Sequence, residues 1–168
     1  MRIIFLLFFL TTFLFSYQTE EKLKAVVIGK VAKYVSWKDE SSSNFVITVL
    51  DNPFGNMLEN IYNNKKIHTK NIKLVYINNI TDLPADTKIL YIPKKDSYEL
   101  SMILQDISDK SILTISDIRG FAQKKGILQI YFFARKLRFK INLEVAKKNK
   151  LYIRSVLLHI AKIVKDES

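Results

Sequence analysis

The sequence has no cysteine among its 168 residues. This absence excludes disulfide bonds, thiolate chemistry, cysteine-ligated metal sites and a lipid-anchored cysteine behind an N-terminal leader. An exported protein of this composition has to rest on core packing alone. Glycine is also scarce, with four residues in the chain. The segment Asn52-Pro53-Phe54-Gly55 lacks the spaced glycines and the Lys-Ser/Thr pair of a phosphate-binding loop, and no G-x-S-x-G nucleophile elbow occurs.

Histidine occurs only twice, and the two residues are far apart in the sequence. His68 falls in a predicted polar loop, and His159 falls in a predicted final helix beside its apolar face. Neither has a second histidine close by with the spacing of a metal site. Ser116 and Asp117 could be grouped with either histidine, but the strained turn of a hydrolase nucleophile is missing. We therefore expect no enzymatic activity, no cofactor and no metal.

The N-terminus has the pattern of a secretory signal peptide. Met1 and Arg2 give a positive start, residues 3–15 are almost wholly apolar, and Ser16 is a small residue at an exit site. We predict cleavage after Ser16, so that residues 17–168 form one domain in the periplasm. A buried N-terminal element and a retained anchor are the alternatives, although the run is shorter than the ~20 residues that cross a bilayer.

Basic residues outnumber acidic ones, which gives a net charge of +11. Such an excess is typical of proteins that bind nucleic acid or membrane surfaces. Here the lysines are spread along the chain, Asn and Ile are plentiful as in AT-rich genomes, and an exported protein rarely meets nucleic acid. We expect no nucleic-acid partner. Attraction of the basic charge to a membrane surface or an acidic partner stays open, as does a homodimer.

Alternating apolar runs and amphipathic segments predict a mainly parallel sheet covered by helices on both faces, with a late antiparallel hairpin. The expected fold is a single three-layer α/β domain. Helices are predicted over residues 20–35, 98–107 and 154–165, with another that runs from the turn at residues 51–55 through Tyr62 and a short one after Asn142. Strands are predicted over residues 45–50, 72–77, 89–92, 112–115, 127–133 and 137–141, the last two joined by a turn at 134–136.

Five segments, taken together and in order, resemble the YfiR family. They are residues 24–37 with the closing Trp37; residues 47–55 with a Pro-Phe-Gly turn; residues 112–126 with Ser116-Asp117 and Gly120-Phe121-Ala122; residues 137–146; and residues 151–161. Relatives often have Pro after the Trp, where this chain has Lys38. Some relatives carry paired cysteines, so any disulfide-linked regulation in them cannot operate here.

The resemblance implies a periplasmic regulatory binding protein that restrains an inner-membrane signalling protein. The expected partner is a diguanylate cyclase or a histidine kinase sensor, so that cyclic-di-GMP would be controlled indirectly. A second hypothesis comes from the residues themselves. A periplasmic small-molecule-binding module that reports to a receptor or transport system would require a pocket of roughly 300 Å³ or more at the carboxyl edge of the sheet.

Five residues are candidates for contact with a ligand or partner. Asp51 and Asp117 each follow a predicted strand, and the carboxyl ends of parallel strands form the ligand-binding edge of open α/β sheets. The plainer interpretation is that each carboxylate caps the following turn or helix. Phe54 and Phe121, in loops after strands, and Arg138, on the outer face of the hairpin, are the candidate interface anchors. For Arg138 the alternative is a solvated sheet face or a local ion pair.

Overall fold

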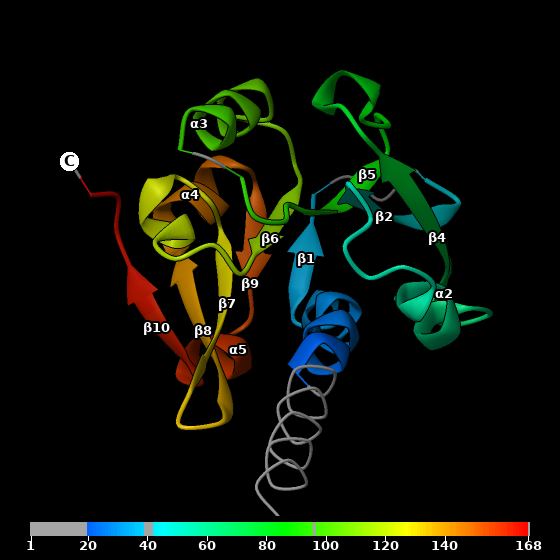
Figure 1. The fold of residues 1–168 in the computed structure, drawn as a ribbon, viewed down its shortest axis with the longest axis horizontal. Helices are drawn as coiled ribbons and strands as arrows, with labels where there is room; N and C mark the ends of the chain where they lie inside the picture. Colours follow the sequence, from blue (N-terminus) through cyan, green and yellow to red (C-terminus); the bar gives the residue numbers. More distant parts are fainter. Residues whose placement is uncertain (1–19, 39–41, 96, 168) are drawn as a thin grey trace, which may run out of the picture.

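The structure, a computed structural model, describes residues 20–38, 42–95 and 97–167. The predicted signal peptide, residues 1–16, lies outside these residues. The described chain folds as an α/β protein with a central, mainly parallel sheet flanked by helices (Figure 1). The fold class predicted from the sequence is confirmed.

The elements follow one another along the chain in an irregular alternation of helices and strands. After a first helix over residues 20–32 come β1 (Val35–Trp37), β2 (Asn44–Leu50), α2 (Met57–Tyr62), β3 (Lys66–Ile67), β4 (Lys70–Ile77), η1 (Ile80–Asp82), β5 (Thr87–Tyr91), α3 (Ser97–Asp106), β6 (Leu113–Ser116), η2 (Phe121–Lys124), β7 (Leu128–Phe133), β8 (Lys136–Asn142), α4 (Leu143–Lys148), β9 (Leu151–Ile153), α5 (Ser155–His159) and β10 (Ala161–Val164).

Eight strands form the main sheet in the order β10-β8-β7-β6-β5-β2-β4-β3. Strands β4, β2, β5, β6 and β7 run parallel, while β8 returns antiparallel to β7 and β10 runs parallel to β8. Strands β1 and β9 pair with each other as a separate two-stranded sheet. The buried runs of β2 and β6 are covered on both faces, as parallel strands require.

Two apolar clusters, one on each face of the sheet, make up the core. The larger cluster joins the first helix and α2 to one face, through side chains such as Ile28, Leu58 and Ile47. The smaller one packs α3 against the other face, through Leu100, Ile103 and Leu90. Because successive strand residues point to opposite faces, neighbouring residues of β5 take part in different clusters. The three layers expected from the sequence are therefore present.

The first helix is fastened to α2 by one buried phenol. The hydroxyl of Tyr62 accepts the backbone N–H of Gly29 at 2.7 Å, and it lies 2.8 Å from the carbonyl oxygen of Ala25 and 2.7 Å from that of Val26. The hydroxyl thus inserts among the backbone N–H and C=O groups of the first helix. A Cβ at Gly29 would come within 2.5 Å of the Tyr62 ring, so only glycine allows this approach.

Two predicted helices are wrong in extent. The first helix ends at residue 32 rather than 35, because residues 35–37 leave it to pair with β9. The predicted final helix over 154–165 is helical only as α5, and residues 161–164 form β10 beside β8 instead. The spacing of the apolar residues in 161–164 fits a helix, but these residues form a strand because they pair with the exposed edge of β8. Val156 and Ile160, which lie on the apolar stripe of the predicted helix, are 52% and 59% exposed.

Candidate functional site

The carboxyl edge of the parallel strands holds Asp51 and Asp117, as the sequence predicts. Asp51 follows β2 and Asp117 follows β6, with β5 between the two strands. At an inter-strand spacing of about 4.8 Å, the two strand ends stand roughly 10 Å apart. Each carboxylate belongs to its own ion-pair group, and the two groups tie different helices to the sheet.

Asp117 binds a lysine of the first helix. The Nζ atom of Lys24 lies 2.7 Å from Oδ2 of Asp117 and 2.7 Å from Oε1 of Glu21. Burial by itself would lower the pKa of Lys24, but the hydrogen bonds to Asp117 and Glu21 outweigh it and raise the pKa above its ordinary value. Lys24 is therefore a firmly charged bridge between two carboxylates, and it holds the beginning of the helix against the edge.

Asp51 belongs to a similar group beside α3. The Nζ atom of Lys95 lies 2.7 Å from Oδ2 of Asp51 and 2.7 Å from Oε1 of Glu99. The hydrogen bond to Asp51, followed by the one to Glu99, raises the pKa of Lys95. Both predicted carboxylates are thus paired with a lysine, which each of them shares with a glutamate. The alternative was that each carboxylate caps a backbone N–H group of the following turn. After β6 that role belongs to Ser116, whose hydroxyl accepts the N–H of Ile118 at 3.1 Å.

The two aromatic candidates lie in the core and are not available as surface anchors. Phe54 is 5% exposed, and its ring centroid is 4.8 Å from that of Tyr91. Phe121 is fully buried and packs on Gly126, where a Cβ would come within 2.3 Å of its ring. Gly126 therefore permits a close contact. The turn pattern of the sequence suggests a positive φ at Gly55, Gly120 and Gly126, but only Gly55 and Gly120 have one. Trp37 is likewise buried.

Arg138 is the one candidate that is exposed and forms no ion pair with any residue the structure describes. It lies on β8 directly opposite Tyr131 of β7. The strand pattern of alternating apolar and basic residues predicted this outward position. The structure therefore leaves Arg138 as a surface residue, separate from the aspartates of the carboxyl edge.

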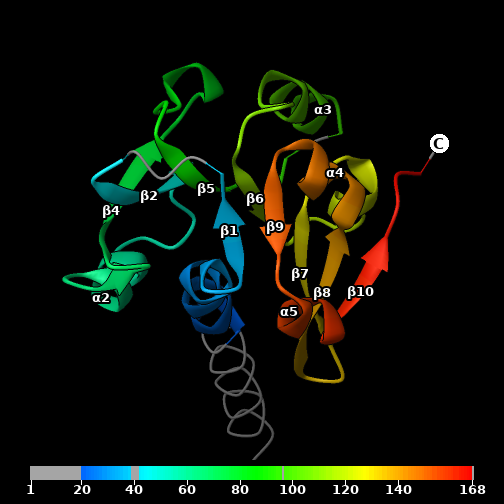
Figure 2. The same cartoon turned by 180° about the vertical axis from the view of Figure 1, so that it is seen from behind.

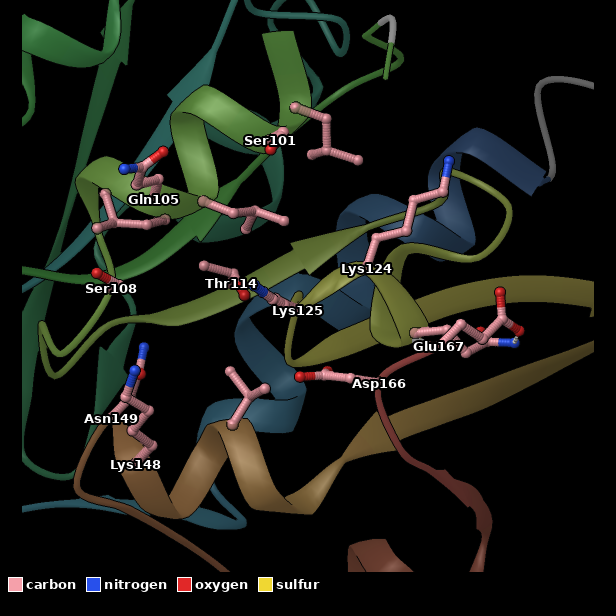
Figure 3. Close-up of a pocket in the computed structure, with 15 residues that line it drawn as sticks. Ser101, Gln105, Ser108, Thr114, Lys124, Lys125, Lys148, Asn149, Asp166 and Glu167 are labelled. Atoms are coloured by element: carbon pink, nitrogen blue, oxygen red, sulfur yellow. Dashed lines mark hydrogen bonds between the residues drawn. The ribbon is translucent and has the colours of Figure 1, made fainter. Parts of the chain in front are cut away.

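A cleft of about 860 Å³ lies on the α3 side of the sheet, away from the edge where the sequence pattern placed a pocket (Figure 3). Residues from five places surround it: α3 with the two residues after it, β6, η2 with Lys125, α4 with Asn149, and the C-terminal segment after β10. Most of the residues that line it are polar, namely Ser101, Gln105, Ser108, Thr114, Gln123, Lys124, Lys125, Lys148, Asn149, Asp166 and Glu167, while Leu100, Leu104, Ile107 and Val145 supply an apolar part. Sequence reasoning did not single out any of these residues.

Asn142 fixes the C-terminal side of this cleft. Its side-chain carbonyl accepts the N–H of Val145 at 3.1 Å, which caps α4, and its amide donates to the carbonyl of Ala122 and to Oδ1 of Asp166. Beyond Asp166, the N–H of Glu167 donates to the carbonyl of Gln123. Three distant parts of the chain, residues 122–123, 142–145 and 166–167, meet here. The sequence signal for this contact is the position of Asn142 before a predicted short helix.

The two histidines have local roles. His68 lies next to Trp37 and Phe45, and its Nε2 is 2.9 Å from the carbonyl oxygen of Ala32. His159, at the end of α5, has Nδ1 2.7 Å from the carbonyl oxygen of Ser155. Within residues 20–38, 42–95 and 97–167, no three His, Cys, Asp or Glu side chains are grouped so that they could hold a metal ion.

A family model described as YfiR/HmsC-like matches residues 21–162, which span nearly all of the described structure from the first helix into β10. The chain belongs to the YfiR/HmsC-like family. The match includes both ion-pair groups, the Tyr62 contact and the hairpin with Arg138. No curated protein matches the chain. Among the described residues of this YfiR/HmsC-like protein, no helix is both long and apolar enough to cross a bilayer.

Proposed function

We propose that this protein is a periplasmic regulator that binds an inner-membrane signalling protein and restrains it without chemistry of its own. The observation that carries the proposal is the YfiR/HmsC-like match across residues 21–162. The family resemblance implies a regulator that acts on the periplasmic part of a diguanylate cyclase or that accompanies a sensor kinase. The expected output is therefore the cyclic-di-GMP level or the activity of a kinase.

Physical reasoning sets what such a regulator has to do. It must bind the inactive conformation of its partner more tightly than the active one, because equal binding shifts nothing. A hundredfold reduction of output needs about 2.7 kcal/mol of differential binding free energy. Structural features fit a rigid docking module: the first helix is locked by Tyr62, and Lys24 and Lys95 each bridge two carboxylates. A rigid body loses little conformational entropy on docking.

The test is a deletion strain, complemented either by the full-length gene or by a copy that lacks residues 1–16. We expect deletion to raise cyclic-di-GMP or kinase output, and only the full-length gene to restore it. Mass spectrometry of the exported protein should find a chain that begins at Tyr17. Unchanged output in the deletion strain, together with no capture of an inner-membrane sensor by the purified protein, would remove the proposal.

The cleft favours a second candidate function, a small-molecule-binding module that reports to a receptor or transport system. Its volume of about 860 Å³ is within the range of small-ligand sites, and its hydroxyl, amide and lysine groups suit amino acids or sugars. The test measures melting temperature with each of the twenty amino acids and common sugars. A Ser101→Trp variant, which adds bulk to the α3 wall of the cleft, is the control. Binding should raise the melting temperature of the parent protein only.

A further inference from the structure

The three strands β7, β8 and β10 place like-charged and aromatic side chains on one face of the sheet. Phe139 and Ile141 of β8 point into the core, so the alternate residues of this strand point the other way. The strand register adds residues from both neighbouring strands to the same face. We call this surface the cationic face; it consists of Tyr131, Phe133, Lys136, Arg138, Lys140 and Lys162.

The positive charges of this face are not neutralised within the described structure. Lys162 lies beside Lys140 in the register of β10 and β8, and like charges in this position repel each other. None of the four cations forms an ion pair with a residue in the described ranges. Lys140 lies over the ring of Tyr131, 5.6 Å from its centroid, and Phe133 is 69% exposed. An anionic ligand would relieve the repulsion.

The margin of the sheet beside this face is open. β10 is the last strand in the order, and both views show no helix or strand of the described chain beyond it (Figures 1 and 2). A terminal strand leaves one row of backbone N–H and C=O groups free to pair with another strand. On the opposite side of β10 from the cationic face, Ile163 is 46% exposed because no neighbouring strand covers it. An added strand would pair with this backbone row and cover Ile163.

The positive charges beside β10 indicate which kind of strand can pair with it. Lysines on an edge strand oppose pairing between two copies, since Lys162 of each copy would be brought close to the other. That protective role explains Lys162, but it does not explain Lys136 and Arg138, which lie one strand further in. A strand added at β10 would lie two inter-strand spacings, about 10 Å, from β8. The long side chains of Lys136 and Arg138 span part of that distance and bring their charges within about one Debye length, ~8 Å, of such a strand. An acidic strand satisfies both the backbone and the charges.

We propose that β10 and the cationic face bind an extended segment of the partner in which acidic and apolar residues alternate. The segment pairs with β10, directs its carboxylates toward Lys162, Lys140 and Arg138, and places its apolar residues over Ile163. Such strand addition draws affinity from the main chain and specificity from alternate side chains. This inference rests on the proposed function, because it assumes that the protein acts by docking.

The direct test uses a capped, fluorescein-labelled peptide of alternating Glu and Val, measured by fluorescence anisotropy. Arg138→Glu and Lys162→Glu should each weaken binding about tenfold or more. Lys66→Glu makes the same charge change on β3, at the other margin of the sheet, and should change the Kd less than about twofold. N-methylation of alternate peptide residues should abolish binding, because it blocks backbone pairing.

Three outcomes would overturn the inference. One is a peptide that does not bind, or that binds all variants equally. Another is binding of the protein to vesicles containing phosphatidylglycerol, lost in Arg138→Glu, with no binding of the peptide; this would make the face a membrane surface. The third is a dimer in sedimentation that Lys162→Glu dissociates. A strain carrying both charge reversals with normal restraint, where the deletion strain has lost it, would refute this surface while leaving the proposed function intact.

Discussion

Replacement of Tyr62 by Phe tests the contact that joins the first helix to α2. The phenol is 6% exposed, and its hydroxyl bonds the Gly29 N–H at 2.7 Å. Tyr62→Phe removes only this hydroxyl, so the N–H and the nearby carbonyls of Ala25 and Val26 lose their partner. Leaving buried backbone groups unsatisfied costs about 1–3 kcal/mol. We expect the free energy of unfolding at pH 7 to fall by about this amount.

The same residue gives a dependence on pH with a defined sign. Burial raises the pKa of Tyr62 from 10.0 to about 12, although the N–H of Gly29 acts in the opposite direction. Above pH 10 the unfolded chain releases the phenolic proton while the folded protein retains it. The stabilisation is therefore complete below pH 10 and is lost as the pH rises to about 12, with a magnitude on the order of 2–3 kcal/mol.

Urea denaturation at pH 7, 10 and 11, followed by circular dichroism, measures both effects. The Tyr62→Phe variant should be less stable at pH 7 and should lose less of its stability than the parent between pH 10 and 11. Tyr152→Phe is the matched control, because Tyr152 is 68% exposed on β9 and should behave like the parent. A Tyr62→Phe variant with the parent's urea midpoint at pH 7 and the parent's slope in alkali would refute the reasoning.

Three further substitutions test other contacts by the same denaturation assay. Phe121→Ala should destabilise the protein by about 3–5 kcal/mol, since the ring is fully buried; a folded variant of normal stability would contradict its place in the core. Gly126→Ala should cost more than Gly55→Ala, because its Cβ meets the Phe121 ring whereas Gly55 has only a positive φ of 53°, worth about 1 kcal/mol; the reverse order would be incompatible with the structure. The double change Ala134→Asn and Arg135→Gly should raise the melting temperature and stabilise by about 1 kcal/mol, because both turn residues have positive φ (48° and 59°); a lower melting temperature would argue against this turn.

The sequence was most informative where hydrophobic patterns were long. The apolar runs of β2, β4 and β5 and the alternation in β8 predicted strands within a few residues of their true ends. The shorter strands β1, β3 and β9 span only two or three residues, too few for a period to show. β10 was assigned to a helix because its apolar spacing fits both structures, and only the edge of β8 decides between them.

In the candidate site, too, some features could be predicted from the sequence and others could not. Parallel strands correctly predicted that Asp51 and Asp117 would lie on the same edge, because that follows from chain direction. Their lysine partners could not be predicted, since Lys24 and Asp117 are separated by 93 positions. The burial of Phe121 could not be predicted either, because it depends on a close contact with Gly126 that appears only in the folded chain.

The basic charge has two separate explanations, one for its amount and one for its position. A genome rich in A and T would account for many lysines spread along the sequence, but it would predict no particular arrangement of them in space. In the folded chain, however, Lys24 and Lys95 pair with acidic residues beside the carboxyl edge. The register of β8 and β10 instead brings Lys140 and Lys162 together, and neither forms an ion pair with a residue that the structure describes. Composition cannot produce that difference, because register is set by the apolar residues on the other face. The unneutralised charge is therefore a property of the fold, and binding of an acidic partner should weaken as salt is raised.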